Sequence, residues 1–395
     1  MTELDPYAYA FHEDPYPTYR WLRDHAPAHH NERLGFYALS RWRDVLDASL
    51  DPTTYSSARG TLVQDIDPAL LEAMPMMIFM DPPRQTRLRK LVGKVFTPRA
   101  MAALEPAIRA LAVRLIEPLV EAGRCEFVSA FAGVLPIETI STLLGVPAAD
   151  RQMVREWTDA SLTRDPDSPA LPRAALEAHA HMRAYFSELV AERRRRPGDD
   201  LVSGLLGAEI ERDDGGGRTR LSDGEIIGFT GLLSGAGNET VTKLLGNAMV
   251  LLARHPEARE ALARAPRRIP GAVEEALRYW PPSQYQGRSL TRDVELHGEK
   301  LPRGARVLLL TGSACRDERE FPDADRFDIA REIPLQLAFG HGVHKCLGAA
   351  LARLESRVSL EEWLARVPRW EVDDAGLERV HMTSVMGFAK VPLRW

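Results

Sequence analysis

Cysteine is scarce in this chain of 395 residues, since only Cys125, Cys315 and Cys346 are present. Three cysteines so far apart cannot build the disulfide framework that stabilises small secreted proteins. Residues 1–20 also lack the apolar run of a signal peptide. Both absences are typical of a protein that folds in a reducing compartment, and we expect the protein to be cytoplasmic.

Lysine is rare as well, because only six of the 51 basic residues are lysine. The formal charge is −5 at pH 7, so the chain has no basic excess that would bind nucleic acid. The longest apolar stretch, residues 226–252, is interrupted by Asn238, Glu239, Lys243 and Asn247, which argues against a membrane span. We therefore expect neither nucleic acid nor a membrane as a partner.

Internal repeats and low-complexity linkers are absent too, and signals for helices dominate the chain. Proline at the start and glycine at the end of periodic segments predict helices, among them residues 14–26, 98–122, 138–144 and 346–367. Short strands are predicted at residues 33–39, 306–310 and 382–388. Length alone suggests two or three domains of about 150 residues. The continuous helical pattern favours one large unit instead, and the expected fold class is mainly α with small β-sheets (α+β).

The longest predicted helix, residues 222–254, begins with a capping box formed by Ser222 and Glu225. It is apolar nearly all round, which indicates burial, yet it contains six glycines, five of them beyond its first turn. Each glycine costs about 1 kcal/mol relative to alanine in a helix. In one interpretation this is a core helix, in which Glu239 pairs with the lysine one turn later and Thr240 bonds a preceding carbonyl. In the other, the helix opens locally beside a flat ligand, and Glu239 and Thr240 take part in chemistry.

The third cysteine lies in a distinctive segment, Phe339-Gly340-His341-Gly342-Val343-His344-Lys345-Cys346-Leu347-Gly348. Its glycines permit a sharp turn, and we expect Cys346 at the start of a helix, where backbone N–H groups stabilise a thiolate. Gly348 would leave room for a bulky planar partner. Three alternatives stay open: an inert buried cysteine, a zinc site with His341 and His344, and a catalytic nucleophile.

This segment resembles the haem-binding loop of the cytochrome P450 family, Phe-Gly-x-Gly-x-His-x-Cys-x-Gly, with every fixed position filled. Other segments agree with the family in order along the chain. Ala236-Gly237-x-Glu239-Thr240 is similar to its oxygen-activation motif, and Glu275-x-x-Arg278 to its Glu-x-x-Arg motif. Residues 81–89 resemble its C helix, and residues 316–331 its meander. The resemblance implies one cytochrome P450 domain over residues 1–395, with a small β-rich N-terminal region and a large helical haem-binding region.

The resemblance also implies how a haem would be held. Cys346 would be the axial thiolate ligand of the iron in haem b, iron protoporphyrin IX. His344, Arg288 and Arg89 would contact the haem propionates. The family usually has histidine where this chain has Gln85, which can donate a hydrogen bond but adds no positive charge. Further haem contacts are implied for Ala236, Phe339, Gly340 and Gly348.

The activity that the resemblance implies is that of a haem-thiolate monooxygenase. It would insert one oxygen atom of O2 into a hydrophobic small molecule by hydroxylation or epoxidation. Thr240 would hold oxygen or water by a hydrogen bond, and Glu239 would relay protons. Glu275 and Arg278 would form a buried structural pair. The substrate would resemble a polyketide or macrolide, a terpenoid, a steroid or a fatty acid, in a pocket that includes Ile78, Phe79, Leu232, Leu233, Ala236, Gln284, Tyr285 and Met386.

An electron source is also implied, because no flavin or iron–sulfur module is recognisable in the sequence. We expect a separate ferredoxin with its ferredoxin reductase, and a monomeric protein. A basic docking surface is predicted from Arg84, Arg87, Arg89, Lys90, Lys94 and Lys345. These residues alternatively form a solvated helix face, with Arg89 directed inward. Two other functions stay open: a non-oxygenating haem-thiolate enzyme (isomerase, dehydratase or peroxygenase), and a haem-based ligand sensor.

Overall fold

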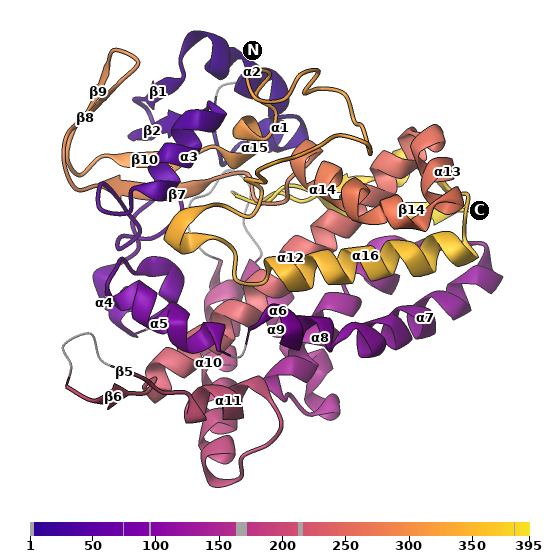
Figure 1. Cartoon of the computed structure of the whole chain (residues 1–395), viewed down its shortest axis with the longest axis horizontal. Coiled ribbons are helices and arrows are strands. Elements are labelled where there is room, and N and C mark those ends of the chain that lie inside the picture. Colours follow the sequence, from indigo (N-terminus) through magenta and orange to yellow (C-terminus); the bar gives the residue numbers. More distant parts are fainter. Residues whose placement is uncertain (1–3, 74, 95, 163–171, 212–215, 383) are drawn as a thin grey trace.

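One long helix, α12 (Asp223–Arg254), passes through the middle of the molecule, and other helices pack around it (Figure 1). The computed structural model describes residues 4–73, 75–94, 96–162, 172–211, 216–382 and 384–395. The Ser222 hydroxyl accepts from the Glu225 N–H at 3.2 Å, and the Glu225 carboxylate accepts from the Ser222 N–H at 3.0 Å. This capping box begins α12 where the sequence predicts it.

The other α-helices lie around α12, and their bounds show that the molecule is mainly helical. They are α1 (Tyr9–Glu13), α2 (Tyr16–His25), α3 (Trp42–Leu50), α4 (Pro68–Ala73), α5 (Arg84–Gly93), α6 (Pro98–Ala102), α7 (Glu105–Ala122), α8 (Leu135–Leu144), α9 (Arg151–Leu162), α10 (Arg173–Arg195), α11 (Leu201–Gly207), α13 (Pro256–Arg264), α14 (Ile269–Tyr279), α15 (Thr311–Ala314) and α16 (Ala349–Arg366). Nowhere in the described part of the chain does a helix combine the length and the apolar composition needed to cross a membrane.

The largest sheet lies on the side of the molecule away from α7 and α13 (Figure 1). Its strand order is β1-β2-β10-β7-β3, formed by β1 (Ala28–Asn31), β2 (Phe36–Leu39), β10 (Arg306–Leu309), β7 (Gln286–Leu290) and β3 (Tyr55–Ser56). Strand β10 is parallel to β2 and antiparallel to β7. The sheet therefore joins the N-terminal segment to a segment about 270 residues later.

The remaining strands form short ladders. They are β11 (Glu371–Val372) with β14 (Pro392–Arg394) and β4 (Arg124–Glu126), β12 (Glu378–Arg379) with β13 (Phe388–Lys390), β5 (Ile210–Glu211) with β6 (Arg218–Thr219), and β8 (Val294–Leu296) with β9 (Glu299–Leu301). The fold class predicted from the sequence, mainly α with small β-sheets, is confirmed.

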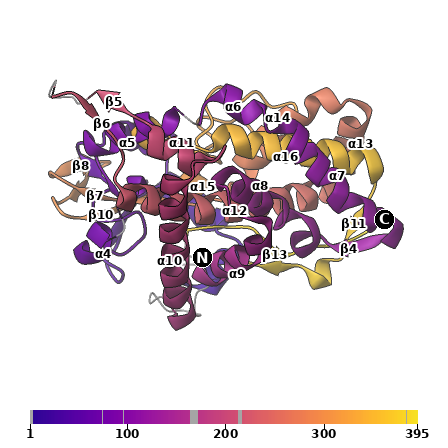
Figure 2. The same cartoon turned by 90° about the horizontal axis from the view of Figure 1, so that it is seen from below.

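Helices α8, α10, α14 and α16 all contact α12, and α10 crosses the molecule on the face seen from below (Figure 2). Two glycines of α12 let neighbouring segments approach the backbone of this helix closely. A Cβ at Gly237 would lie 3.1 Å from the Ile140 side chain of α8, and one at Gly228 would lie 3.0 Å from the Pro75 carbonyl oxygen. The glycines of this helix are therefore partly explained by packing. The α-helix is continuous through this region, so the locally opened helix is not observed.

Several predicted boundaries are wrong, since α8 begins three residues earlier than predicted and β2 begins three residues later. The helix predicted at residues 98–122 is two helices, because the ring of Pro106 would collide with the carbonyl four residues earlier, at Ala102, where α6 ends. The last long helix begins at Ala349, three residues after Cys346. The strand predicted at residues 382–388 is confined to Phe388–Lys390. Before it, the chain bonds to the segment between α14 and β7, where the Met386 N–H donates to the Pro282 carbonyl.

Candidate active site

The cysteine loop folds back on itself between α15 and α16. Gly340 and Gly342 adopt left-handed conformations, with φ of 64° and 69°. The Cys346 N–H donates to the Phe339 carbonyl at 2.8 Å and closes the loop. At Gly342 a Cβ would lie 2.3 Å from the backbone oxygen of Ser49 in α3. Glycine is therefore required there by both conformation and close approach.

Cys346 is exposed on the wall of a cavity of about 290 Å³. Burial raises the pKa of its thiol, whereas hydrogen bonds from the Gly348 and Ala349 N–H groups, and the charge of Arg89, lower it. Cys346 precedes α16 instead of starting it, yet the first N–H groups of that helix still reach its sulfur. The predicted backbone N–H contacts are therefore present, but burial outweighs them and the pKa of the thiol is raised overall. Stabilisation of the thiolate stays a prediction.

Most residues predicted to surround the ligand line this one cavity. The cavity walls include the predicted cofactor contacts Gln85, Arg89, Ala236, Arg288, Phe339, Gly340, His344, Cys346 and Gly348. They also include the predicted substrate contacts Ile78, Leu232 and Leu233, together with Thr240. The fold thus brings together side chains from α5, α12, β7 and the cysteine loop, which are far apart in the sequence.

Four predicted pocket residues do not line the cavity: Phe79, Gln284, Tyr285 and Met386. Tyr285 is buried in a separate cluster with Leu308 and Leu310. Side chains alternate between the two faces of a strand, so Gln286 and Arg288 face the cavity and Tyr285 faces away. Gln284 is held by its own turn, where its amide donates to the Pro281 carbonyl at 2.6 Å. Met386 is buried in the main core.

Three basic side chains on the cavity wall have no acidic partner. No carboxylate among the described residues forms an ion pair with Arg89, Arg288 or His344. Burial, with the charge of Arg306, lowers the pKa of Arg288 to about 10, and burial also lowers that of Arg89. Burial and the charges of Arg288 and Arg89 lower the pKa of His344 to about 3. With so low a pKa, His344 is neutral near pH 7, and the charges on the cavity wall are those of the buried Arg288 and the half-buried Arg89. Such guanidinium groups are costly without an acidic partner, and they fit a ligand that carries carboxylates.

Gln85 and His344 tie the loop to the rest of the protein. The Gln85 side chain, which is buried, donates to the Val343 carbonyl at 2.7 Å. The His344 Nε2 lies 3.2 Å from the Ser57 hydroxyl. Gln85 therefore has a protein partner in addition to its position on the cavity wall.

On α12, the predicted acid and alcohol face different surroundings. The Thr240 hydroxyl lines the cavity and donates to the Ala236 carbonyl at 2.9 Å. Glu239 does not line the cavity, and its carboxylate lies 2.7 Å from the Lys243 ammonium. Both contacts of the core-helix interpretation are thus present.

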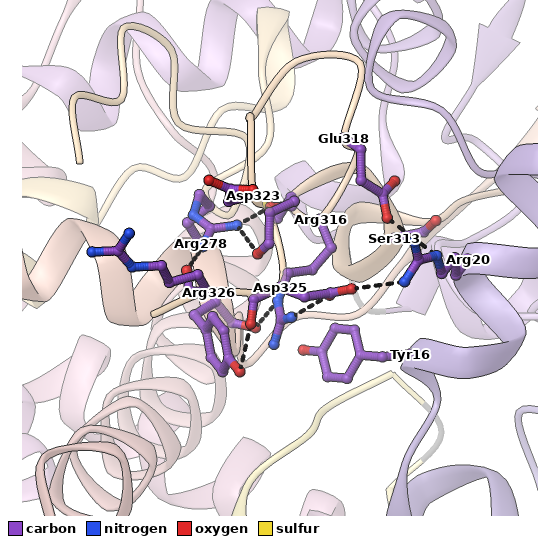
Figure 3. Close-up of polar contacts among 12 residues, drawn as sticks. Tyr16, Arg20, Arg278, Ser313, Arg316, Glu318, Asp323, Asp325 and Arg326 are labelled. Atoms are coloured by element: carbon purple, nitrogen blue, oxygen red, sulfur yellow. Dashed lines mark hydrogen bonds and ion pairs between the residues drawn. The ribbon is translucent and has the colours of Figure 1, made fainter. Parts of the chain in front are cut away.

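Glu275 and Arg278 of α14 are fully buried, with the carboxylate 2.7 Å from the guanidinium. Arg278 also donates to the carbonyls of Cys315, Ala324 and Arg326 (Figure 3). Nearby, Arg316 binds Asp325 at 2.7 Å and lies over the ring of Tyr16 from α2 (Figure 3). The pair therefore anchors residues 315–328 against α14.

Sequence reasoning missed several cavity residues. Phe96 and Phe229 meet edge to face at 6.2 Å. Phe229 shares the helical face of Leu233, Ala236 and Thr240, so its spacing could have identified it. Ile140 and the buried Glu355 come from α8 and α16, and no local signal marked them.

The comparisons with known proteins agree with this geometry. A family model described as Cytochrome P450 matches residues 269–390. Cytochrome P450 130 of Mycobacterium tuberculosis is 41% identical over 370 residues, which cover 92% of this chain and 90% of that protein. The chain belongs to the cytochrome P450 family. A vitamin D(3) 25-hydroxylase of Pseudonocardia autotrophica is 37% identical over 98% of this P450 and 96% of that protein. The solved structure of CYP109Q5 from Chondromyces apiculatus matches with a TM-score of 0.89 and 36% identity, covering 99% and 97% of the two chains.

Cytochrome P450 enzymes are oxidoreductases with a haem-thiolate cofactor, and the residues of this P450 fit that group. The cavity offers one thiol and two arginines, Arg89 and Arg288, that have no ion-pair partner among the described residues. Gly348 has open space where a Cβ would be, as a planar ligand close to the backbone requires. The zinc alternative has no support, since no cluster of three His, Cys, Asp or Glu side chains suited to a metal ion occurs among the described residues.

The predicted basic docking surface of this P450 is largely engaged within the protein. Arg87 pairs with Glu225 at 2.7 Å, and Arg84 lies 3.8 Å from the same carboxylate. Lys94 contacts the Glu209 carbonyl, and Arg89 faces the cavity. Arg89 thus does not belong to a docking surface. Lys345, beside Cys346, is exposed.

Proposed function

We propose that this P450 inserts one oxygen atom of O2 into an apolar small molecule, by hydroxylation or epoxidation, with electrons from a separate ferredoxin and its reductase. The observation that carries the proposal is the position of Cys346, on the wall of a cavity that also presents Thr240 and two arginines, Arg89 and Arg288, without ion-pair partners among the described residues. These are the groups that oxygen activation on a thiolate-ligated haem needs.

Haem b is the proposed cofactor. Cys346 would ligate the iron, Arg89, Arg288 and His344 would hold the propionates, and Phe339, Gly340, Gly348 and Ala236 would contact the ring. When bound, the haem supplies oxygen activation, which thiolate ligation favours. The protein excludes water with apolar walls. In the proposed reaction, the Thr240 hydroxyl holds a water molecule in the cavity by a hydrogen bond, and Glu239 passes a proton toward it.

The proposed substrate is apolar with at least one oxygen function. The cavity walls are mostly apolar, with Met77, Ile78, Phe229 and Leu233 among them. Among the polar residues on the walls are Gln286 and Ser283, and the Gln286 amide donates to the Ser283 hydroxyl at 3.1 Å. Such a pair suits a hydroxyl or carbonyl group on a large hydrocarbon skeleton. One relative is named for vitamin D(3), and a structural neighbour, CYP109E1 from Bacillus megaterium, was solved with testosterone. Steroid-like, terpenoid and macrolide molecules share this chemistry.

The deciding experiment is the absorption spectrum of the reduced protein under carbon monoxide. Wild-type protein and the control variant Cys125→Ser should show the red-shifted band of thiolate-ligated haem, because Cys125 lies in β4, outside the cavity. The Cys346→Ser variant should lose this band. A variant that keeps it would exclude Cys346 as the ligand. A wild-type protein without it would refute the proposed function.

A further inference from the structure

Arg353 of α16 is held in place by a carboxylate of the neighbouring helix α14. Its guanidinium donates two hydrogen bonds to the Glu274 carboxylate, at 2.5 and 3.0 Å. Such a two-point contact fixes the plane of a guanidinium as well as its position. The side chains are only partly exposed, 38% for Arg353 and 27% for Glu274, so water screens this pair less than a pair on an open surface. The orientation of Arg353 is therefore set by α14 as well as by α16.

Glu274 also binds the chain just before the cysteine loop. Its backbone carbonyl accepts from the Gln336 amide at 3.0 Å, and the Gln336 side-chain oxygen accepts from the Ala338 N–H at 3.1 Å. This one residue of α14 is thus bound to the start of the loop by its backbone, and to α16, which follows the loop, by its side chain. Both ends of the loop that carries Cys346 are therefore attached to the same point of α14.

The guanidinium of Arg353 lies over the aromatic ring of Phe339. The distance from the Arg353 Cζ to the ring centroid is 4.5 Å, which is typical of a cation–π contact. Phe339 lines the ligand cavity, whereas Arg353 lines a different pocket of about 320 Å³. The Phe339 carbonyl accepts the Cys346 N–H that closes the loop. Arg353 therefore covers, from outside the cavity, the ring of the residue whose backbone holds the cysteine.

The positive charge of Arg353 also reaches the sulfur. It lowers the pKa of the Cys346 thiol, and the thiolate raises the pKa of Arg353 in return. Arg89 has the same effect on the thiol but lies on the cavity wall, so Arg353 acts from the opposite side. Reduction adds one negative charge to a thiolate-ligated haem, and a cation nearby favours the reduced form. The charge of Arg353 is thus placed where it stabilises the reduced state.

We propose that Arg353 is a positioning residue of the cysteine loop, which holds the Phe339 ring and keeps a positive charge near Cys346, and that it thereby raises the reduction potential of the haem. The proposal rests on the thiolate-ligated haem of the proposed function. Glu274 has two opposite effects. It fixes the guanidinium over the ring, and its own negative charge partly offsets that of the arginine.

The test is a spectroelectrochemical titration of the haem in the holoprotein, with imidazole added so that every variant has the same iron coordination. Arg353→Met should have a more negative midpoint potential than wild type, because the cation that favours the reduced form is gone. Arg353→Lys keeps the charge but not the planar fork, and its potential should lie between the two. Arg357→Met is the matched control, since that side chain lies one turn further along α16 and pairs with Glu105 and Glu361. Its potential should equal that of wild type.

A second variant tests the charge while the arginine stays in place. Glu274→Gln keeps an oxygen that accepts from Arg353 and loses the negative charge, so its midpoint potential should be more positive than that of wild type. Damage to the fold alone would not shift Arg353→Met and Glu274→Gln in opposite directions. Equal potentials in Arg353→Met and wild type, an equal shift in Arg357→Met, or a negative shift in Glu274→Gln would overturn the proposal. A wild-type protein without the carbon monoxide band would refute the proposed function instead, before any potential is measured.

Discussion

At the scale of single residues, the cations of the cavity are the clearest sign of an anionic ligand. Arg288 is buried, and its pKa is lowered by burial and by Arg306. Its side chain donates a hydrogen bond to the neighbouring Gly287 carbonyl at 2.7 Å. A buried guanidinium in such surroundings gains most from a carboxylate that arrives with a ligand.

Arg288→Gln should therefore lose haem. A hydrogen bond between charged groups contributes about 1.5–3 kcal/mol. The equilibrium constant for haem transfer to an acceptor protein should therefore be at least about tenfold larger for the variant than for wild type. Arg292→Gln is the matched control, because that side chain is 70% exposed and lies beyond the strand end. Equal haem retention by both variants would exclude Arg288 as a propionate contact.

Glu355 predicts a pH effect on stability. Its side chain is buried, and one carboxyl oxygen has no hydrogen-bond partner within the described structure. Burial raises its pKa well above the usual value. The folded state thus keeps a proton that the unfolded chain releases above about pH 4.3, and this linkage lowers stability as pH rises toward the folded pKa.

In the Glu355→Gln variant, the decrease of stability with rising pH that is caused by Glu355 should disappear. The unfolding free energy of the variant relative to wild type should increase between about pH 5 and pH 8, by at most about 1.4 kcal/mol per pH unit. Chemical denaturation at several pH values measures this, with Glu299→Gln on an exposed strand as the control. A difference that stays constant with pH would show that Glu355 is ionised in the folded protein.

At the scale of elements, the cysteine loop shows how far sequence reasoning reaches. Its glycines, its turn and the convergence of its cysteine with Thr240 were predictable, because each depends on local residue types or on a specific motif. The side of the strand on which Tyr285 lies was not, because it depends on the register of β7 against β10. The pairing of Glu239 with Lys243, by contrast, was predictable from their spacing of four residues along the helix. The roles assigned to individual site residues stay predictions.

The loop makes an element-scale prediction about stability. Gly342→Ala should destabilise the protein, because the left-handed conformation costs about 1–2 kcal/mol for alanine and the new Cβ would lie 2.3 Å from the Ser49 backbone oxygen. The matched control is Gly93→Ala at the end of α5, where a Cβ would meet nothing within 4 Å. This variant should be more stable than wild type by up to about 1 kcal/mol. Thermal unfolding that ranks the two variants equally would show that the loop relaxes freely.

At the scale of the whole molecule, distant segments are held by buried charges instead of by sequence neighbours. Glu275 binds Arg278, accepts from the Asp328 N–H at 2.8 Å, and lies 3.4 Å from Arg331. Arg278 joins α14 to carbonyls about 40 residues further along the chain. This one pair therefore connects the helix layer around α12 to the segment that leads into the cysteine loop.

Arg278→Met should damage the whole fold, because it leaves the Glu275 carboxylate buried and removes a donor from three carbonyls. Breaking a buried pair on one side costs about 3–5 kcal/mol, a large part of the stability of an ordinary domain. We expect mostly insoluble protein, or soluble protein with a midpoint of denaturation far below wild type. Arg326→Met is the control, since that side chain is 70% exposed and Arg278 binds only the backbone carbonyl of Arg326, which the substitution keeps. If Arg278→Met instead matched this control in denaturation midpoint, residues 315–328 would be held by backbone packing alone, and the buried charges would have no role in joining the two parts of the molecule.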